Sequence, residues 1–204
     1  MPSDKSDNLY TETIISRKVR LPYTAVGKNL ENNLKIMISH MMEGKCSKEG
    51  YIQVGTMKIL TYSVGLQIAN DVEFEVVISC YVCCPVEDMY FNCVVKNKTG
   101  AGIRAEVTYE QELSHQVALW SRNDPGANTE NITKNIETKM GSKSEYNSPI
   151  VVYLAAEHND TKLMENCDPG NEISIKVRGQ RYELNDRHVN IIGQLVSIKN
   201  KSNE

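Results

Sequence analysis

The chain lacks a long apolar run, an apolar leader and an excess of basic charge, and each absence excludes a class of function. No apolar stretch approaches the roughly 20 residues of a membrane-spanning helix, so we expect no membrane partner. The start, MPSDKSDNLYTETIIS, has no apolar segment typical of a secretory signal, so the expected compartment is cytoplasmic or nuclear. The formal net charge is −3, whereas autonomous binding of duplex DNA usually needs a large basic excess. Weak, local contact with single-stranded nucleic acid remains open.

Features of catalytic sites are also missing. There is no phosphate-binding loop of Walker or Rossmann form. His115 lies near Glu112 and His158 near Asp160, but no Ser or Cys nucleophile is placed against either histidine. We expect no catalytic residues and no cofactor.

Cysteine is the one residue type that could suggest a metal. The chain has six, and Cys80 and Cys83 have the spacing of a zinc or redox pair. A complete zinc site needs a second pair of ligands at suitable spacing, and Cys93 stands alone. Core packing as small apolar side chains is the favoured interpretation, with no metal.

Residues 1–84 have the pattern of an α+β module, in which one helix lies on a small antiparallel sheet. The helix is expected over 28–43, where apolar residues recur at spacings of three and four. Alternation on the first strand puts Thr11, Thr13 and Ile15 on one side. Residues 63–71 are expected to form a loop. The strands are expected at Tyr10–Leu21, Tyr51–Val54, Thr56–Tyr62 and Phe74–Cys84.

Residues 85–204 have an all-β pattern that follows Pro85 without a flexible linker. Five strands with a long connection after the second favour a five-stranded Greek-key barrel of the OB type. The connection, about 110–148, is interpreted as a partly mobile insertion, with a short helix that puts Ile132 and Ile136 on one side. The strands are expected at Met89–Lys96, Ile103–Thr108, Ile150–Ala156, Glu172–Leu184 and His188–Ile198.

The order of several short motifs resembles one family over nearly the whole chain. The motifs are Gly44-Lys-Cys46, Gly50-Tyr-Ile52, Glu73-Phe-Glu-Val76, Pro85-Val-Glu-Asp88, Gly102–Val107 and Ile191–Leu195. In that order they resemble the seventh-largest subunit of RNA polymerase II and its archaeal counterpart, E-prime, in which a tip module is fused to an S1-type OB barrel. Pro85-Val-Glu-Asp88 replaces the family's Gly-rich start of the barrel. With an Asn-, Ile- and Lys-leaning composition, this departure indicates a homologue from a large DNA virus.

The resemblance implies a non-catalytic stalk subunit of a DNA-directed RNA polymerase, located in a cytoplasmic viral factory or virion if viral and in the nucleus if cellular. Its partners would be the large catalytic subunits, a helical companion stalk subunit and nascent single-stranded RNA, bound weakly and without sequence preference. Docking on the polymerase core is expected at Gly50, Tyr51, Ile52, Gly65 and Leu66. RNA contact is expected at Tyr90, Phe91, Lys96, Lys98, Arg104, Tyr153, Arg178 and Arg181. Tyr90 and Phe91 must point to opposite sides of their strand, so only one of them can face RNA.

Two alternatives stay open. A free-standing S1-domain factor of translation or RNA decay would have the same fold but a more basic barrel. A purely structural virion protein is also compatible with the sequence.

Overall fold

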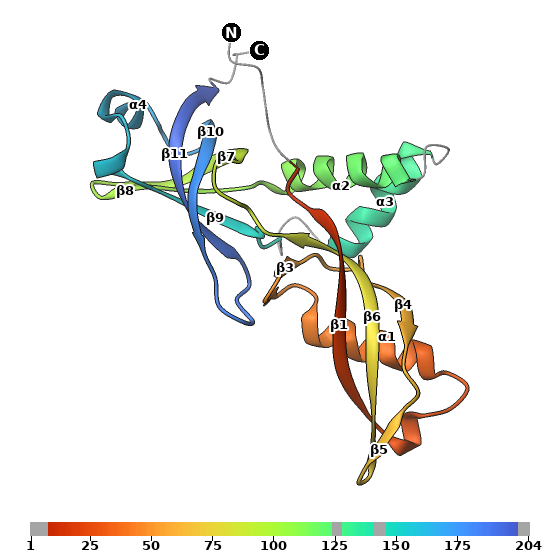
Figure 1. Cartoon of the computed structure of the whole chain (residues 1–204). Helices are drawn as coiled ribbons and strands as arrows, with labels where there is room; N and C mark the ends of the chain where they lie inside the picture. The colour runs from red at the N-terminus through yellow and green to blue at the C-terminus, as the bar shows by residue number, and fades with distance from the viewer. Residues whose placement is uncertain (1–7, 124–127, 141–145, 200–204) are drawn as a thin grey trace.

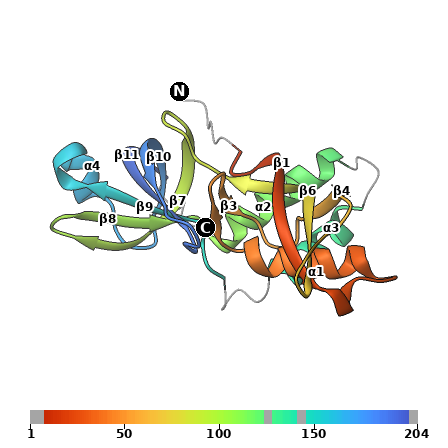
Figure 2. The same cartoon turned by 60° about the horizontal axis from the view of Figure 1, so that its bottom comes forward.

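The computed structural model describes residues 8–123, 128–140 and 146–199 and shows a mixed α+β protein. A six-stranded sheet with one long helix lies beside a closed five-stranded barrel, and a pair of helices stands next to both (Figure 1). A second view shows the barrel and the sheet at opposite ends of the molecule, with the strand β3 lying between them (Figure 2). We call the part before Pro85 the N-terminal module.

The N-terminal module is organised around two long antiparallel strands, β1 (Thr11–Pro22) and β6 (Asp71–Cys83), which pair over their whole length. The expected strands and helix are confirmed within a few residues. The expected loop over 63–71 is wrong in part, because it contains a short strand. The other elements are the 3-10 turn η1 (Tyr23–Ala25), the helix α1 (Leu30–Met42) and the strands β2 (Cys46–Ser47), β3 (Gly50–Ile52), β4 (Lys58–Tyr62) and β5 (Leu66–Ile68).

Alternation along β1 decides which face of this sheet is buried. Ile15, Val19 and Leu21 point to one side and are buried, whereas the residues between them are exposed or half-exposed. Leu34 and Ile38 of α1 pack against that side, because their spacing puts them on one stripe of the helix. The opposite side of the sheet carries charged residues such as Glu73 and Glu75 together with the exposed Ile14.

The barrel closes in the order β10-β11-β9-β8-β7, with β7 returning to β10. β9 runs parallel to β11, and the other neighbours are antiparallel. This arrangement of five strands is OB-like. The expected pairing of the last two strands back onto the rest of the barrel is confirmed. The strands are β7 (Tyr90–Thr99), β8 (Gly102–Glu106), β9 (Ile150–Ala155), β10 (Glu172–Arg181) and β11 (Val189–Lys199), with η2 (Ala156–His158) and α4 (Thr161–Glu165) between β9 and β10.

The connection after the second barrel strand is helical rather than irregular. It forms α2 (Tyr109–Asn123) and α3 (Thr129–Met140), which pack against each other. Ile132 and Ile136 are buried on one side of α3, as predicted. The helix α2 was not expected from the sequence, since its buried side includes the polar residues Glu112 and Gln116.

The core of the barrel extends into the N-terminal module, which also has a core of its own between α1 and its sheet. Leu9, Tyr10, Cys46, Tyr51 and Cys83 of the N-terminal module belong to the same buried cluster as the inner side chains of the barrel. All six cysteines are free, and every one except the half-buried Cys84 is buried as a small apolar side chain. Because apolar contacts continue across Pro85, we expect the described parts to unfold together.

Candidate nucleic-acid interface

Three exposed side chains line up across the outer surface of the barrel, and we call them the barrel row: Arg104, Tyr153 and Ile192. Arg104 on β8 is paired with Tyr153 on β9, and Tyr153 is paired with Ile192 on β11. Tyr153 is 45% exposed and Ile192 is 56% exposed. Since alternate residues of these strands fill the barrel, the row must point outward. It presents an aromatic ring between a guanidinium group and an apolar side chain.

The chemistry of the barrel row suits a base better than a phosphate. Arg104 already forms an ion pair with Glu106 of its own strand, at 2.7 Å. Its positive charge is therefore partly neutralised. Tyr153 and Ile192 offer the kind of surface on which an unpaired base can stack, and such stacking tolerates any sequence.

A second outward cluster lies around Tyr90 at the other end of β7. Lys176 of β10 sits 5.8 Å from the centre of the Tyr90 ring and forms an ion pair with Asp88 at 2.7 Å. The hydrogen bond between them lowers the pKa of Asp88 and raises the pKa of Lys176. Arg178 is 3.9 Å from the same carboxylate and bonds Gln194. The cations of this cluster are thus engaged with neighbours of the chain itself.

The remaining residues expected to contact RNA do not form one surface. Phe91 is 2% exposed and fills the barrel, so its assignment to RNA is wrong, because closure of the barrel turns it inward. Lys98 donates to the Glu165 carbonyl at 2.8 Å and is tied to α4. Lys96 and Arg181 are exposed, at opposite ends of the barrel sheet.

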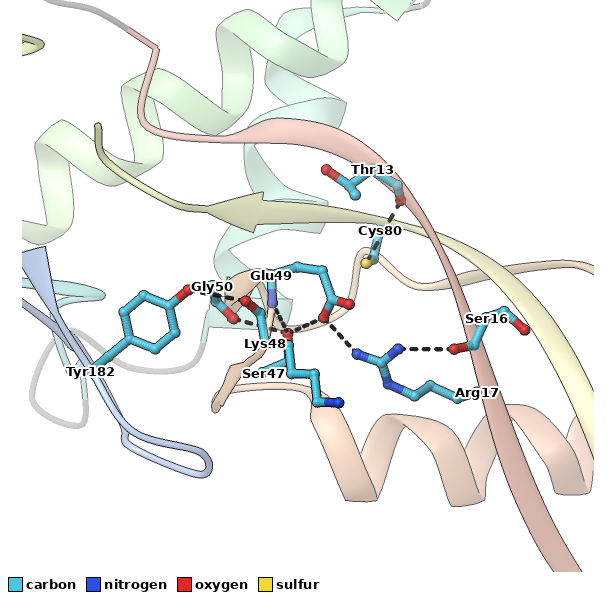
Figure 3. A network of polar contacts seen from close by, with 9 residues as sticks. All are labelled: Thr13, Ser16, Arg17, Ser47, Lys48, Glu49, Gly50, Cys80 and Tyr182. Atoms are coloured by element: carbon cyan, nitrogen blue, oxygen red, sulfur yellow. Dashed lines mark hydrogen bonds and ion pairs between the residues drawn. The ribbon is translucent and has the colours of Figure 1, made fainter. Parts of the chain in front are cut away.

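The barrel is fixed to the N-terminal module by hydrogen bonds around the β2–β3 turn (Figure 3). The Tyr182 hydroxyl donates to the Lys48 carbonyl at 3.2 Å. The N–H of Cys46 donates to Asp186, at 2.7 Å, and the N–H of Asn185 donates back to Cys46, at 2.9 Å. The turn between β10 and β11 is therefore held against the N-terminal module.

The β2–β3 turn is itself anchored to β1. Arg17 forms an ion pair with Glu49, and Ser47 bonds the same carboxylate, as Figure 3 shows. Partial burial raises the pKa of Glu49, but the hydrogen bonds from Ser47 and Arg17 outweigh this effect and hold the pKa below its usual value. The turn is thus a rigid joint between three segments that are far apart in the sequence.

Three of the residues expected to dock on a polymerase lie inside this joint. Gly50, Tyr51 and Ile52 are buried, so they cannot themselves meet a partner, and that assignment is wrong for direct contact. Gly50 has φ +128°, and a Cβ there would lie 2.5 Å from the Cys83 carbonyl oxygen. Its role is to let two strands approach. Gly65 likewise packs closely against Val72 and Phe74.

Leu66, the last of the expected docking residues, belongs to an exposed apolar surface at the end of the N-terminal module farthest from the barrel (Figure 1). Val64 is 95% exposed and Leu66 is 63% exposed. We call this surface the apolar edge, formed by Val64, Leu66 and Ile68; Leu66 and Ile68 lie opposite Glu73 and Asp71, on the face of the sheet away from α1. The alternation of apolar residues from 60 to 68 does not by itself define this surface, because Tyr62 lies opposite Val76 on the α1 side of the sheet.

Comparison with known proteins adds no family to this description. No protein-family model matches the chain, and no curated protein is significantly similar to it. Within the described ranges, no helix is long and apolar enough to span a membrane. In the same residues, no three His, Cys, Asp or Glu side chains are grouped so that they could hold a metal ion.

Proposed function

We propose that this protein is a non-catalytic stalk subunit of a DNA-directed RNA polymerase. In this proposal the N-terminal module corresponds to a tip module that docks on the large catalytic subunits. The barrel corresponds to an S1-type OB domain that contacts exiting single-stranded RNA. The observation that carries the proposal is the barrel row, an exposed aromatic surface on an OB-like barrel that is fixed without a linker to a second module.

The rigid joint supports a positioning role. A free RNA-binding domain gains nothing from hydrogen bonds between the β10–β11 turn and a neighbouring module. A stalk needs them, because its barrel must stay at one place relative to the polymerase. The joint formed by Cys46, Asn185 and Asp186 is of this kind.

The apolar edge is the surface that would dock. Exposed apolar residues gathered at one place mark protein interaction sites, whereas single exposed ones are ordinary. The edge replaces Gly50, Tyr51 and Ile52 as the docking assignment and keeps Leu66. Three parts of the proposal rest on the resemblance. They are a helical companion subunit, an origin in a large DNA virus and a location in the viral factory or virion.

The alternative is a free S1-domain factor of translation or RNA decay. It would bind single-stranded RNA alone, with an affinity that falls steeply as salt increases. The net charge of −3 and the engaged cations Arg104 and Lys176 favour the stalk.

The test is co-purification of tagged full-length protein from cells that express it with its own transcription machinery. We expect the large polymerase subunits to be recovered with the natural chain and with Tyr153→Ala, but lost with the double variant Val64→Asp and Leu66→Asp. Ile14→Asp is the matched control, because Ile14 is 66% exposed on β1. Recovery of ribosomal or RNA-decay proteins in place of polymerase would support the alternative.

A further inference from the structure

A small polar pocket lies where the N-terminal module, α2 and the β10–β11 turn meet. Its volume is about 260 Å³. That is slightly below the range of pockets that hold drug-sized ligands, so a single small group fits it. Side chains from these three parts and from the segment before β9 line it: Tyr51 and Gln53 from the N-terminal module, Glu112 and Gln116 from α2, Tyr146 before β9, and Arg187 from the turn.

A buried carboxylate forms one wall of this pocket. Glu112 is 5% exposed and accepts hydrogen bonds from the hydroxyls of Tyr10 and Tyr146, each at 2.5 Å, and from Gln116 at 3.1 Å. Burial raises the pKa of Glu112, and these donors act against that rise. A carboxylate has about four acceptor positions. Three are used, and the side-chain nitrogen of Gln53 faces the remaining one.

Gln53 supplies a donor that faces Glu112. Its backbone is fixed on both sides, since its N–H donates to Tyr81 at 3.0 Å and its carbonyl accepts from Thr56 at 2.9 Å. The side chain is 3% exposed. Its nitrogen is directed at Glu112 and lowers the pKa of that carboxyl, yet within the described part of the chain it makes no hydrogen bond of ordinary length and angle. A buried amide donor without a partner is rare in native proteins.

The pocket thus offers a donor and an acceptor side by side, with aromatic rings in its lining. The Tyr146 ring is held by an edge-to-face contact with Tyr109, 5.5 Å between centres. Arg187 is exposed on the turn, and Cys46 fixes the residue before it. A planar heterocycle with a carbonyl beside an N–H would satisfy Gln53 and Glu112 together. A phosphate attached to it would be attracted to Arg187.

We propose that this pocket binds one nucleotide through a base that carries a carbonyl next to an N–H, as uracil and guanine do. Gln53 donates to the carbonyl, Glu112 accepts from the N–H, and Arg187 faces the phosphate. Adenine lacks the carbonyl and cytosine lacks the ring N–H beside it, so both should bind much more weakly. The inference does not depend on the proposed function, because the barrel row takes no part in it.

The test is ligand titration of the full chain, observed through the side-chain amide resonances of Gln53 and Gln116. With UMP or GMP we expect saturable shifts of both resonances. With AMP, CMP or ribose 5-phosphate we expect at least tenfold weaker effects. No saturable shift with UMP or GMP up to about 5 mM, a regime that covers very weak binding, would overturn the proposal. Equal binding of AMP would also overturn it.

Variants identify the contacts. Gln53→Met removes the donor at similar length and should weaken UMP binding tenfold or more, whereas Gln67→Met, an exposed position on β5, should change nothing. Arg187→Met should abolish the preference for UMP over uridine. If Gln53→Met does not fold, the measurement on the natural chain still decides. Undiminished UMP binding by folded Gln53→Met would contradict the assignment.

Two sources of the nucleotide are distinguished by a last comparison. If UMP shifts the Gln53 resonance as strongly as a short oligouridylate, the ligand is a free nucleotide. If only the oligonucleotide does so, the ligand is a nucleotide of an RNA strand. Tyr153→Ala should leave the UMP response unchanged, so loss of the barrel row cannot be mistaken for loss of the pocket.

Discussion

Removal of the Tyr10 hydroxyl tests the contact that joins the N-terminal segment to α2. Tyr10 is 1% exposed and donates to Glu112 at 2.5 Å, across 102 residues of sequence. Tyr10→Phe keeps the ring and its packing and deletes one donor. A hydrogen bond to a charged acceptor contributes about 1.5–3 kcal/mol, and one to a neutral acceptor about 0.5–1.5 kcal/mol. The loss of stability in Tyr10→Phe should therefore depend on whether Glu112 is protonated.

The direction of the pH dependence follows from the pKa of Glu112. Burial raises that pKa in the folded protein, so the folded carboxyl keeps its proton at pH values where the unfolded one, with a pKa of about 4.3, has lost it. The stability of the natural protein thus falls as pH rises from the unfolded pKa to the folded one. Tyr10→Phe removes a donor that lowers the folded pKa. In the variant the stability therefore continues to fall up to a higher pH. The difference in stability between the variant and the natural protein grows over that pH range.

The assay is urea unfolding followed by far-ultraviolet circular dichroism between pH 4 and pH 9. We expect Tyr10→Phe to be less stable by about 0.5–1.5 kcal/mol at the acidic limit and by about 1.5–3 kcal/mol once Glu112 is ionised. In a protein of this size each kcal/mol lowers the Tm by roughly 2–4 °C. Tyr23→Phe, at a position 66% exposed, is the control and should match the natural protein. A deficit below about 0.5 kcal/mol at every pH would refute the buried contact.

Two further substitutions test the corrections to the predicted site. Gly50→Ala should destabilise the protein by at least about 1–3 kcal/mol, because its φ strains any other residue and the added Cβ also meets the Cys83 carbonyl oxygen. Gly100→Ala, with nothing within 4 Å of its added Cβ, should be nearly neutral in the same unfolding assay. Equal stability of the two variants would contradict the packing role of Gly50 and would favour the original assignment to docking. Phe91→Ala should cost about 3–5 kcal/mol and Tyr90→Ala no more than about 1 kcal/mol, and the reverse order would mean that β7 faces the other way.

The elements that could be predicted from the sequence are those with a clear apolar period. Alternation defined β1 and the opposite directions of Tyr90 and Phe91, and the helical period defined α1. The helix α2 could not be found in this way. Its buried face carries Glu112 and Gln116, whose partners Tyr10 and Tyr146 come from distant segments.

The candidate site was predictable only in its residue types. Arg104 and Tyr153 were both expected to contact RNA, but their adjacency depends on the register between β8 and β9, which no local pattern specifies. Ile192 was missed because an apolar residue in a strand is ordinarily assigned to the core. The docking residues Gly50 and Tyr51 were assigned through resemblance, and the structure buries them.

The most direct test of the account is the affinity of the full chain for a labelled single-stranded RNA of about 12 nucleotides, measured by fluorescence anisotropy at low salt. Stacking on one aromatic side chain contributes about 1–3 kcal/mol per base, so Tyr153→Ala should weaken binding by roughly 5- to 150-fold, with Tyr23→Ala unchanged. Binding of Tyr153→Ala equal to that of the natural protein, or a preference for duplex RNA, would contradict a role of the barrel row in contacting single strands.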